Sequence, residues 1–246
     1  MQEESFLYQE DDLVYKILTP MNRDAAMIVL ARAFCTEPVC SAVVEIRPDL
    51  VSRFHDWVEF VECWMDHCST NNLSVIAIDV KNHRVAGAFI ARDFFFFPQG
   101  FLETFGPEAD SDKSLRPWMS FLLHLDSEAQ RAHLPLAQAK LGDAVDLWLL
   151  GVHPDYRGRK IANHLVRLSL ILAQSAGFKY ATIEATNAFT SKAAILNNFQ
   201  KIVQIEAKDW LWNGAPLYTN APAPHGNWTF WIKDLSNSTH SCFPTN

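Results

Sequence analysis

A chain of 246 residues, of which 49% are hydrophobic and 20% charged, has room for one large domain or two small ones. This composition is that of a globular protein and excludes an intrinsically disordered chain. The net charge of −7, with Lys and Arg unclustered outside one loop, argues against nucleic acid as a partner. No apolar run approaches the roughly 20 residues of a membrane span, so we expect no membrane partner either.

The cysteines and the first residues of the chain indicate in which cellular compartment the protein is expected. Five cysteines leave one unpaired in any disulfide scheme, and the acidic first residues lack the basic and apolar regions of a signal peptide. We therefore expect reduced thiols and a cytoplasmic protein. Cys63, His67 and Cys68 lie close in sequence, but no second ligand pair follows at zinc spacing, so no metal site is expected. The acidic net charge favours a cationic substrate such as an amine.

The first third of the chain is predicted to hold a tail, two helices and three strands. In chain order these are a flexible tail over residues 1–12, a strand over 13–18, a helix over 24–34, a helix from 48 to about 69, and strands over 74–80 and 84–92 that form a hairpin. Apolar alternation indicates the strands, and apolar residues three or four apart indicate the helices. The first helix is expected to end before Pro38, because the residue before a proline is pushed out of the helical region.

Residues 94–141 are the least regular part of the chain. Turn residues come first, followed by an apolar stretch over 118–125 and a polar one over 126–140, which predicts a loop and then one or two helices. Insertions of this length between strands often cover a site. The aromatic residues 94–97 and Trp118 are expected to anchor the insertion to the core, or alternatively to line an acceptor pocket.

The second half alternates strands and helices. The predicted elements are a strand over 144–152, a helix that begins near 161 and ends before Gly177, a strand over 180–185, a helix over 187–198, strands over 201–208 and 227–232, and a tail over 236–246. Strands adjoin helices all along the chain, so the fold class is α/β or α+β. We expect one domain over 13–235, with a mixed central sheet of about six to seven strands flanked by helices.

A basic loop at 157–162 follows the strand over 144–152 and opens the next helix. A loop that opens a helix presents unpaired backbone N–H groups, and the positive end of the helix dipole points the same way. Such a place binds phosphate. Arg157, Arg159 and Lys160 add positive charge, so the loop is a candidate phosphate site.

This stretch resembles motif A of the GNAT N-acetyltransferase superfamily, whose loop reads Arg/Gln-x-x-Gly-x-Gly/Ala and holds the pyrophosphate of acetyl-CoA. The first and last positions match, and Lys160 stands at the middle glycine. The resemblance implies a GNAT-type domain with acetyl-CoA as co-substrate, bound by Arg157, Gly158, Arg159, Lys160, Ile161 and Ala162. In that family the preceding strand splays from its neighbour and pairs with the pantetheine arm. Leu150, Gly151 and Val152 stand at that place, and a backbone N–H among them is the expected oxyanion donor.

A second resemblance concerns the catalytic base. Residues 34–38, Phe-Cys-Thr-Glu-Pro, resemble the Asp-Glu-Pro segment of the insect-type arylalkylamine N-acetyltransferases, in which the glutamate is the general base. The resemblance gives Glu37 this role. A carboxylate shielded by neighbouring apolar side chains can have a raised pKa and accept a proton from an ammonium group. Asp146 and Glu184 remain alternatives, and each could equally make a structural hydrogen bond.

Residues 187–192 resemble GNAT motif B, in which an asparagine touches the pantetheine arm and adenosine. Asn187 would take that role, although it is also a good helix cap. Many members place a tyrosine further along this helix as the acid that protonates the departing thiolate, and Ala194 stands there. The insect-type enzymes use serines in this region, so Ser191, or failing that Thr190, is the expected acid.

Together the resemblances imply an acetyl-CoA-dependent N-acetyltransferase. The expected acceptor is a small primary amine, either an arylalkylamine or a polyamine-like molecule, which attacks directly in a ternary complex. One alternative is a protein acetyltransferase that modifies lysine or an N-terminus. The other is a GNAT-fold pseudoenzyme that binds CoA and serves as an interaction module, motivated by Lys160 and Ala194. The sequence leaves the acceptor and the oligomeric state open.

Overall fold

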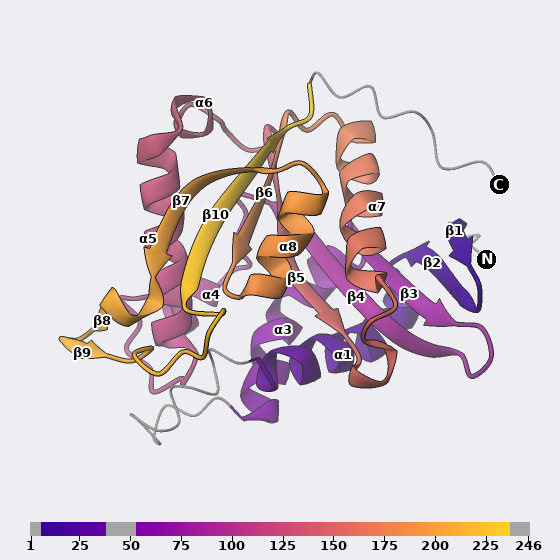
Figure 1. Ribbon diagram of the computed structural model, residues 1–246, viewed down its shortest axis with the longest axis horizontal. Helices are drawn as coiled ribbons and strands as arrows, with labels where there is room; N and C mark the ends of the chain where they lie inside the picture. Colours follow the sequence, from indigo (N-terminus) through magenta and orange to yellow (C-terminus); the bar gives the residue numbers. More distant parts are fainter. Residues whose placement is uncertain (1–5, 38–52, 237–246) are drawn as a thin grey trace.

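The computed structural model describes residues 6–37 and 53–236. Within them the chain forms an eight-stranded sheet in the order β1-β2-β3-β4-β5-β6-β10-β7, with helices on both faces (Figure 1). Neighbouring strands are antiparallel except for β5 and β6, which are parallel. The strands of this sheet are β1 (Phe6–Glu10), β2 (Leu13–Ile17), β3 (Val75–Asp79), β4 (Arg84–Asp93), β5 (Ala144–Val152), β6 (Tyr180–Ala185), β7 (Gln200–Glu206) and β10 (Asn227–Asp234). The predicted mixed α/β fold is therefore confirmed.

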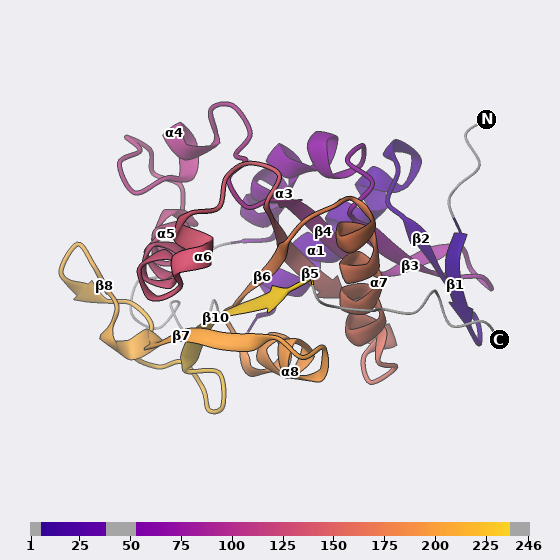
Figure 2. The same ribbon diagram turned by 90° about the horizontal axis from the view of Figure 1, so that it is seen from above.

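The helices form a layer on each face of the sheet (Figure 2). They are α1 (Arg23–Cys35), α3 (Phe54–Cys68), α4 (Phe101–Phe105), α5 (Arg116–Ala132), α6 (Leu134–Ala137), α7 (Ile161–Ser175) and α8 (Ala188–Leu196), with single turns η1 (Pro20–Asn22), η3 (Pro154–Tyr156) and η4 (Ala207–Asp209). The helices α1, α3 and α5 share one hydrophobic core, and α7 and α8 share the core on the other face. No helix in the described residues is both long enough and apolar enough to cross a membrane.

Two glycines let a helix approach the middle of the sheet from each face. A Cβ on Gly151 of β5 would lie 3.0 Å from the Cβ of Ala33 and 3.2 Å from the Cα of Leu30, both on α1. A Cβ on Gly87 of β4 would lie 2.8 Å from the Cγ2 of Ile161, at the start of α7. Because neither strand carries a side chain at these points, α1 and α7 both pack close to the β4–β5 pair.

A bulge in β5 sets up the functional site. Ile90 pairs with Leu149 and Arg92 with Asp146, so two residues of β5, Leu147 and Trp148, lie opposite one residue of β4. Strand β5 then pairs with β6 only over residues 144–146. Beyond that point the two strands diverge and open a wedge between their C-terminal ends (Figure 1). This is the splayed strand that the resemblance implied.

The sheet has more strands than expected, because residues assigned to a flexible tail form an edge strand. Strand β1 pairs with β2 across a tight turn in which Asp11 has a φ of 53°. The ring of Tyr8 lies 5.6 Å from that of His164 on α7, which holds the strand against the domain. Acidic and amide residues flank the short run of residues 6–8 on both sides, so the composition of this segment indicates a tail and hides the pairing.

The insertion forms the helices α4, α5 and α6, in agreement with the predicted loop followed by one or two helices. Helix α5 buries its apolar face in the core shared with α1 and α3. The helix expected from residue 48 is observed as α3 from Phe54, and its first predicted residues lie outside the described ones. The loop after β7 carries a small hairpin of β8 (Leu211–Trp212) and β9 (Ala215–Pro216). Most of the predicted C-terminal tail, residues 237–246, also lies outside the described residues.

Candidate active site

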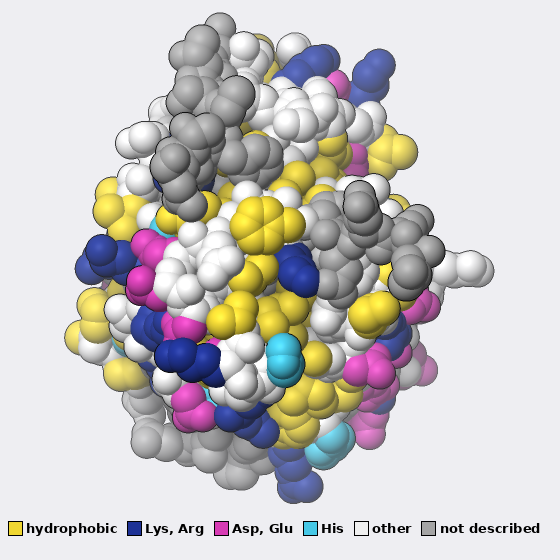
Figure 3. Space-filling model, turned by 90° about the vertical axis from the view of Figure 1, so that its right-hand side faces the viewer, with side chains coloured by type: hydrophobic (Ala, Val, Ile, Leu, Met, Phe, Trp, Pro, Cys, Tyr) yellow, Lys and Arg dark blue, Asp and Glu magenta, His cyan; other side chains and the backbone are white. Residues whose placement is uncertain are grey.

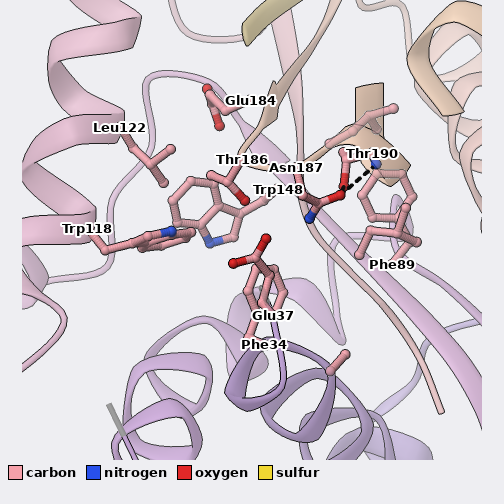
Figure 4. A pocket seen from close by; sticks show the side chains of 13 residues that line it. Phe34, Glu37, Phe89, Trp118, Leu122, Trp148, Glu184, Thr186, Asn187 and Thr190 are labelled. Atoms are coloured by element: carbon pink, nitrogen blue, oxygen red, sulfur yellow. Dashed lines mark hydrogen bonds between the residues drawn. The ribbon is translucent and has the colours of Figure 1, made fainter. Parts of the chain in front are cut away.

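A cavity of about 540 Å³, counting the space open at its mouth, lies at the wedge between β5 and β6. Its wall draws on the end of α1, on β4, β5 and β6, on α5 from the insertion and on the start of α8 (Figure 4). The lining residues are Ala33, Phe34, Glu37, Phe89, Trp118, Leu122, Leu147, Trp148, Leu150, Glu184, Thr186, Asn187 and Thr190. Of the expected site residues, the cavity therefore gathers Glu37, Leu150 and Asn187, and two of the alternatives, Glu184 and Thr190.

Glu37 points into this cavity from just beyond the end of α1 (Figure 4). Its backbone N–H donates to the carbonyl oxygen of Phe34 at 3.0 Å, which holds the loop against the helix end. The ring of Phe34 in turn stacks on Trp57 of α3 at 4.9 Å. The Glu37 side chain is only 6% exposed. A buried carboxylate on a rigid turn is well placed to accept a proton from a bound molecule.

Two indole rings form the wall beside Glu37. Trp118 comes from α5 and Trp148 from the bulge in β5, and their ring centroids lie 6.2 Å apart. Each Nε1–H is buried without a hydrogen-bond partner among the described residues. Figure 4 shows the Trp148 nitrogen on the side of its ring that faces the Glu37 carboxylate, with the Trp118 ring beside it. A buried donor without a partner costs about 1–3 kcal/mol, so these two N–H groups mark places where a polar atom of a ligand or a water fits.

Sequence reasoning missed Trp148, because only the bulge turns it into the cavity. It anticipated Trp118 as one of two alternatives, and the structure places this side chain in the cavity wall. The phenylalanines at the start of the insertion lie elsewhere: Phe94, Phe95 and Phe97 line a separate groove beside α5.

Two buried carboxyl groups, those of Asp126 and Asp146, and one guanidinium lie behind the cavity. Arg92 of β4 and Asp146 of β5 form an ion pair at 2.8 Å, and neither side chain is exposed. The Arg92 guanidinium also lies 4.6 Å from the ring centre of Trp148. Asp146 does not line the cavity, and its pairing with Arg92 gives it a structural role. Within the described residues no cluster of acidic, histidine and cysteine side chains is arranged to hold a metal ion.

Glu184, the other alternative base, does reach the cavity. It extends from β6 on the same face of the sheet as α5, where Asp126 lies behind it. Burial, and then the charge of Asp126, raise the pKa of Glu184 well above its usual value. The group is therefore protonated under conditions in which an exposed glutamate would be ionised.

The basic loop before α7 holds two residues in the left-handed conformation. Gly158 has a φ of 81° and Lys160 a φ of 60°. A Cβ on Gly158 would meet nothing within 4 Å, so this glycine is required by its backbone conformation and not by space. Position 160, where the motif has its middle glycine, requires the left-handed conformation, which glycine adopts freely. Lys160 adopts this conformation at a cost of about 1–2 kcal/mol. Ile161 and Ala162 follow as the first residues of α7, whose first N–H groups have no acceptor within the helix.

The cations of this loop differ in their surroundings. Arg159 forms an ion pair with Asp12, so its charge is matched within the protein, and hydrogen bonding to Asp12 raises its pKa. Arg157 lies close to the end of α1, where its Nη2 is 3.4 Å from the hydroxyl oxygen of Thr36. On the face shown in Figure 3, Lys and Arg side chains lie among Asp and Glu side chains. Among the loop's cations, Arg157 and Lys160 are therefore better suited than Arg159 to meet a phosphate.

The free edge of β5 presents two N–H groups to the wedge. In an antiparallel ladder alternate residues bond to the same neighbouring strand. The N–H of His153 donates to the carbonyl oxygen of Ala86 at 2.9 Å, which places Gly151, two residues earlier, on the edge that faces β4. The N–H groups of Leu150 and Val152 therefore point the other way, into the wedge.

The start of α8 closes the far side of the wedge. The Oδ1 atom of Asn187 accepts hydrogen bonds from the N–H groups of Phe189 and Thr190, both at 2.9 Å. This cap fixes the side-chain amide, so its Nδ2 group is left to face the cavity (Figure 4). Thr190 lines the cavity, whereas Ser191 lies 3.1 Å from the hydroxyl oxygen of Thr229 and does not. A strand edge, an amide donor and a helix-opening loop fit a ligand that carries amides and a pyrophosphate, as acetyl-CoA does.

No family model matches the chain, and no curated protein matches its sequence. Solved structures do match. The C-terminal condensation domain of Ebony, in complex with beta-alanyl-dopamine, superposes with a TM-score of 0.73 at 15% identity, over 90% of this chain and 98% of that one. Arylalkylamine N-acetyltransferase 2 from Aedes aegypti superposes with a TM-score of 0.71 at 20% identity, over 92% of this chain and 100% of that one. The polyamine N-acetyltransferase from Drosophila melanogaster superposes with a TM-score of 0.65 at 14% identity, over 91% of this chain and 100% of that one.

Similarity at such low identity establishes the fold. The splayed β5–β6 pair and the loop before α7 lie where the sequence resemblance placed them. The chain therefore has the GNAT fold, and the solved structures that it resembles include insect arylalkylamine N-acetyltransferases.

Proposed function

We propose that the protein is an acetyl-CoA-dependent N-acetyltransferase that modifies a small primary amine by direct attack in a ternary complex. The observation that carries this proposal is the position of the Glu37 carboxylate, which is buried in a cavity at the open edge of β5. The fold adds support, since the structural neighbours include arylalkylamine and polyamine N-acetyltransferases.

The residues that would hold acetyl-CoA follow the wedge. The loop over residues 157–162 would receive the pyrophosphate, the β5 edge would pair with the pantetheine arm, and the Asn187 amide would donate to it. When bound, acetyl-CoA supplies an activated acetyl group and a thiol that leaves. The N–H groups of Leu150 and Val152 can then donate to the thioester oxygen as it gains negative charge.

Glu37 would act as the general base. An amine must lose a proton before or during attack, and the carboxylate accepts that proton directly or through a water held by the Trp118 and Trp148 N–H groups. The cavity wall carries two hydroxyl groups, those of Thr186 and Thr190, and that of Thr190 on α8 can donate a proton to the departing thiolate. Ser191, which the sequence favours, could act there only after leaving its contact with Thr229.

The walls favour a small acceptor over a protein. Trp118 and Leu122 on α5 close the side of the cavity that an open peptide groove would need. We also propose that the reaction takes place in the cytoplasm, since the described cysteines, Cys35, Cys63 and Cys68, are unbridged.

Two measurements test the proposed function. Acetyl-CoA should raise the melting temperature of the purified protein, because a ligand that binds only the folded state stabilises it. Thiol release should then appear when a panel of primary amines is added. Absence of a thermal shift would refute every acetyltransferase assignment, whether the acceptor is an amine or a protein. A shift without thiol release from any amine, peptide lysine or peptide N-terminus would favour a CoA-binding module instead.

A further inference from the structure

Three guanidinium groups gather near His153, where β5 has ended and the chain turns toward α7. Arg32 extends from α1, Arg84 is the first residue of β4, and Arg157 is the first residue of the basic loop. The Nη1 atom of Arg32 lies 3.1 Å from the Nε2 atom of His153, and the Nη2 atom of Arg84 lies 3.2 Å from the same nitrogen. Arg157 is held beside them, since its Nη2 atom donates to the hydroxyl of Thr36 at the end of α1.

His153 cannot satisfy these donors. Its ring is buried, and its Nδ1 atom lies 3.3 Å from the backbone nitrogen of Asp155. Burial lowers the pKa of His153, and the three guanidinium charges lower it further, so the imidazole is neutral and has one acceptor nitrogen. If Nδ1 accepts from the Asp155 N–H, then Nε2 carries the hydrogen and accepts from neither arginine. In the other tautomer, Nε2 offers one lone pair to two guanidinium groups.

The cluster also lacks matching negative charge. In the part of the chain that the structure describes, Arg32 and Arg157 pair with no carboxylate, and Arg84 lies 3.8 Å from the carboxylate of Asp155. One carboxylate therefore stands beside three guanidinium groups, in a protein whose net charge is −7. Holding like charges together costs free energy. Because all three arginines are exposed, an anion from solution can reach them and offset that cost.

The chemistry of the cluster selects a phosphate monoester. A guanidinium group binds phosphate oxygens in pairs through its planar fork of N–H donors. Forks that approach from α1, β4 and the loop before α7 can surround a tetrahedral group. A phosphate monoester carries a charge of about −1.5 to −2 at pH 7, more than a phosphate diester, and so matches several cations.

The position of the cluster identifies where such a group would come from. Acetyl-CoA has one phosphate monoester, at the 3′ position of its ribose, on the far side of the pyrophosphate from the pantetheine arm. In the proposed binding mode the arm enters the wedge along β5, and the pyrophosphate lies on residues 157–162. The nucleotide end then stays outside the wedge, and Arg157 belongs both to the pyrophosphate loop and to the cluster.

We propose that Arg32, Arg84 and Arg157 bind the ribose 3′-phosphate of acetyl-CoA, with His153 positioning the first two. This inference rests on the proposed function and adds to the cofactor site two arginines from outside the basic loop. It makes the 3′-phosphate a determinant of affinity, so the protein distinguishes acetyl-CoA from acetyl-3′-dephospho-CoA.

Isothermal titration calorimetry with these two ligands tests the proposal. The wild-type protein should bind acetyl-CoA about tenfold more tightly than acetyl-3′-dephospho-CoA, because hydrogen bonds between guanidinium and phosphate are charge-assisted. This advantage should shrink as the ionic strength rises, since exposed charges are screened by salt.

Arg32→Gln and Arg84→Gln are the test variants. Each should weaken acetyl-CoA binding about three- to tenfold, change the affinity for acetyl-3′-dephospho-CoA less than about twofold, and keep the melting temperature. Arg131→Gln is the matched control, because it removes the same charge from an exposed arginine on α5 that pairs with Glu128. Both affinities of this control should stay within about twofold of the wild type.

Equal affinity of the wild type for the two ligands would overturn the inference and leave the proposed function standing. Equal losses for both ligands in Arg32→Gln would overturn it as well, since they would reflect the general charge of the protein. Inorganic phosphate tests for a separate phosphate ligand. If it raises the melting temperature of the wild type but not of Arg32→Gln, while the two ligands bind equally, the cluster does not serve the cofactor. Binding of neither ligand by the wild type would instead count against the proposed function.

Discussion

Replacing Lys160 by glycine should stabilise the protein. Lys160 is the residue before α7 and has a φ of 60°, a conformation in which a side chain costs about 1–2 kcal/mol. Glycine removes that cost but gives the unfolded chain more freedom, which offsets about 0.4–1 kcal/mol. Removing a positive charge from a helix N-terminus increases the free energy of unfolding by about 0.3–1 kcal/mol. The sum is a gain of about 1 kcal/mol, or a rise in melting temperature of about 2–4 °C for a chain of this size.

Lys160→Ala is the matched control, because it removes the charge and keeps the side chain in the left-handed conformation. Urea unfolding of the three proteins separates the contributions: the glycine variant should be more stable than the alanine variant by about 1 kcal/mol. Equal stability of the two variants would refute the claim that the backbone conformation selects glycine at this position. Acetyl-CoA affinity, measured on the same proteins, should be kept in the glycine variant if the backbone N–H groups dominate phosphate binding, and reduced in both variants if the ammonium group does.

Three other outcomes follow from the packing and the buried charges. Burial raises the folded-state pKa of Asp126 to about 7 and that of Glu184 well above its usual value, whereas the unfolded values are about 4, so the folded chain holds more protons. The pair therefore makes the free energy of unfolding fall as the pH rises from about 4 through 7. Asp126→Asn should flatten that fall in urea unfolding, and an unchanged slope would contradict it. Gly151→Ala should destabilise by about 1–3 kcal/mol because its Cβ meets α1, whereas Gly226→Ala, where a Cβ meets nothing within 4 Å, should change the unfolding free energy by less than about 0.5 kcal/mol. Thr190→Val should lower kcat with little change in acetyl-CoA affinity if its hydroxyl protonates the thiolate, and an unaltered kcat in steady-state assays would exclude that role.

Local sequence patterns were enough to predict the basic loop at residues 157–162 and those cavity residues that lie at the ends of helices. Residues 157–162 stand between an apolar strand and a helical repeat, so their place at the start of α7 follows from sequence spacing alone. Glu37 follows a helix end, and Asn187 precedes a helix, which are also local features. Their meeting in one cavity depended on the family resemblance, since no periodicity brings residues 37 and 187 together.

The features that no local pattern predicts arise from contacts between distant segments. The bulge that turns Trp148 into the cavity is visible only in the pairing of β5 with β4. The Asp126–Glu184 pair joins a helix of the insertion to β6, and either residue alone resembles an ordinary polar position. The ion pair of Arg159 with Asp12 likewise depends on the turn between β1 and β2, which the sequence predicted as a tail.

The position of Glu37 in the cavity is the centre of the account, and Glu37→Gln tests it most directly. Glutamine keeps the shape of the side chain and removes the base, so acetyl-CoA affinity should stay within about twofold of the wild type while kcat/KM for the amine falls by about 10²–10⁴-fold. The loss should shrink at high pH, where more of the free amine is already deprotonated. A variant that keeps kcat/KM within about threefold of the wild type would contradict the assignment of Glu37 as the base.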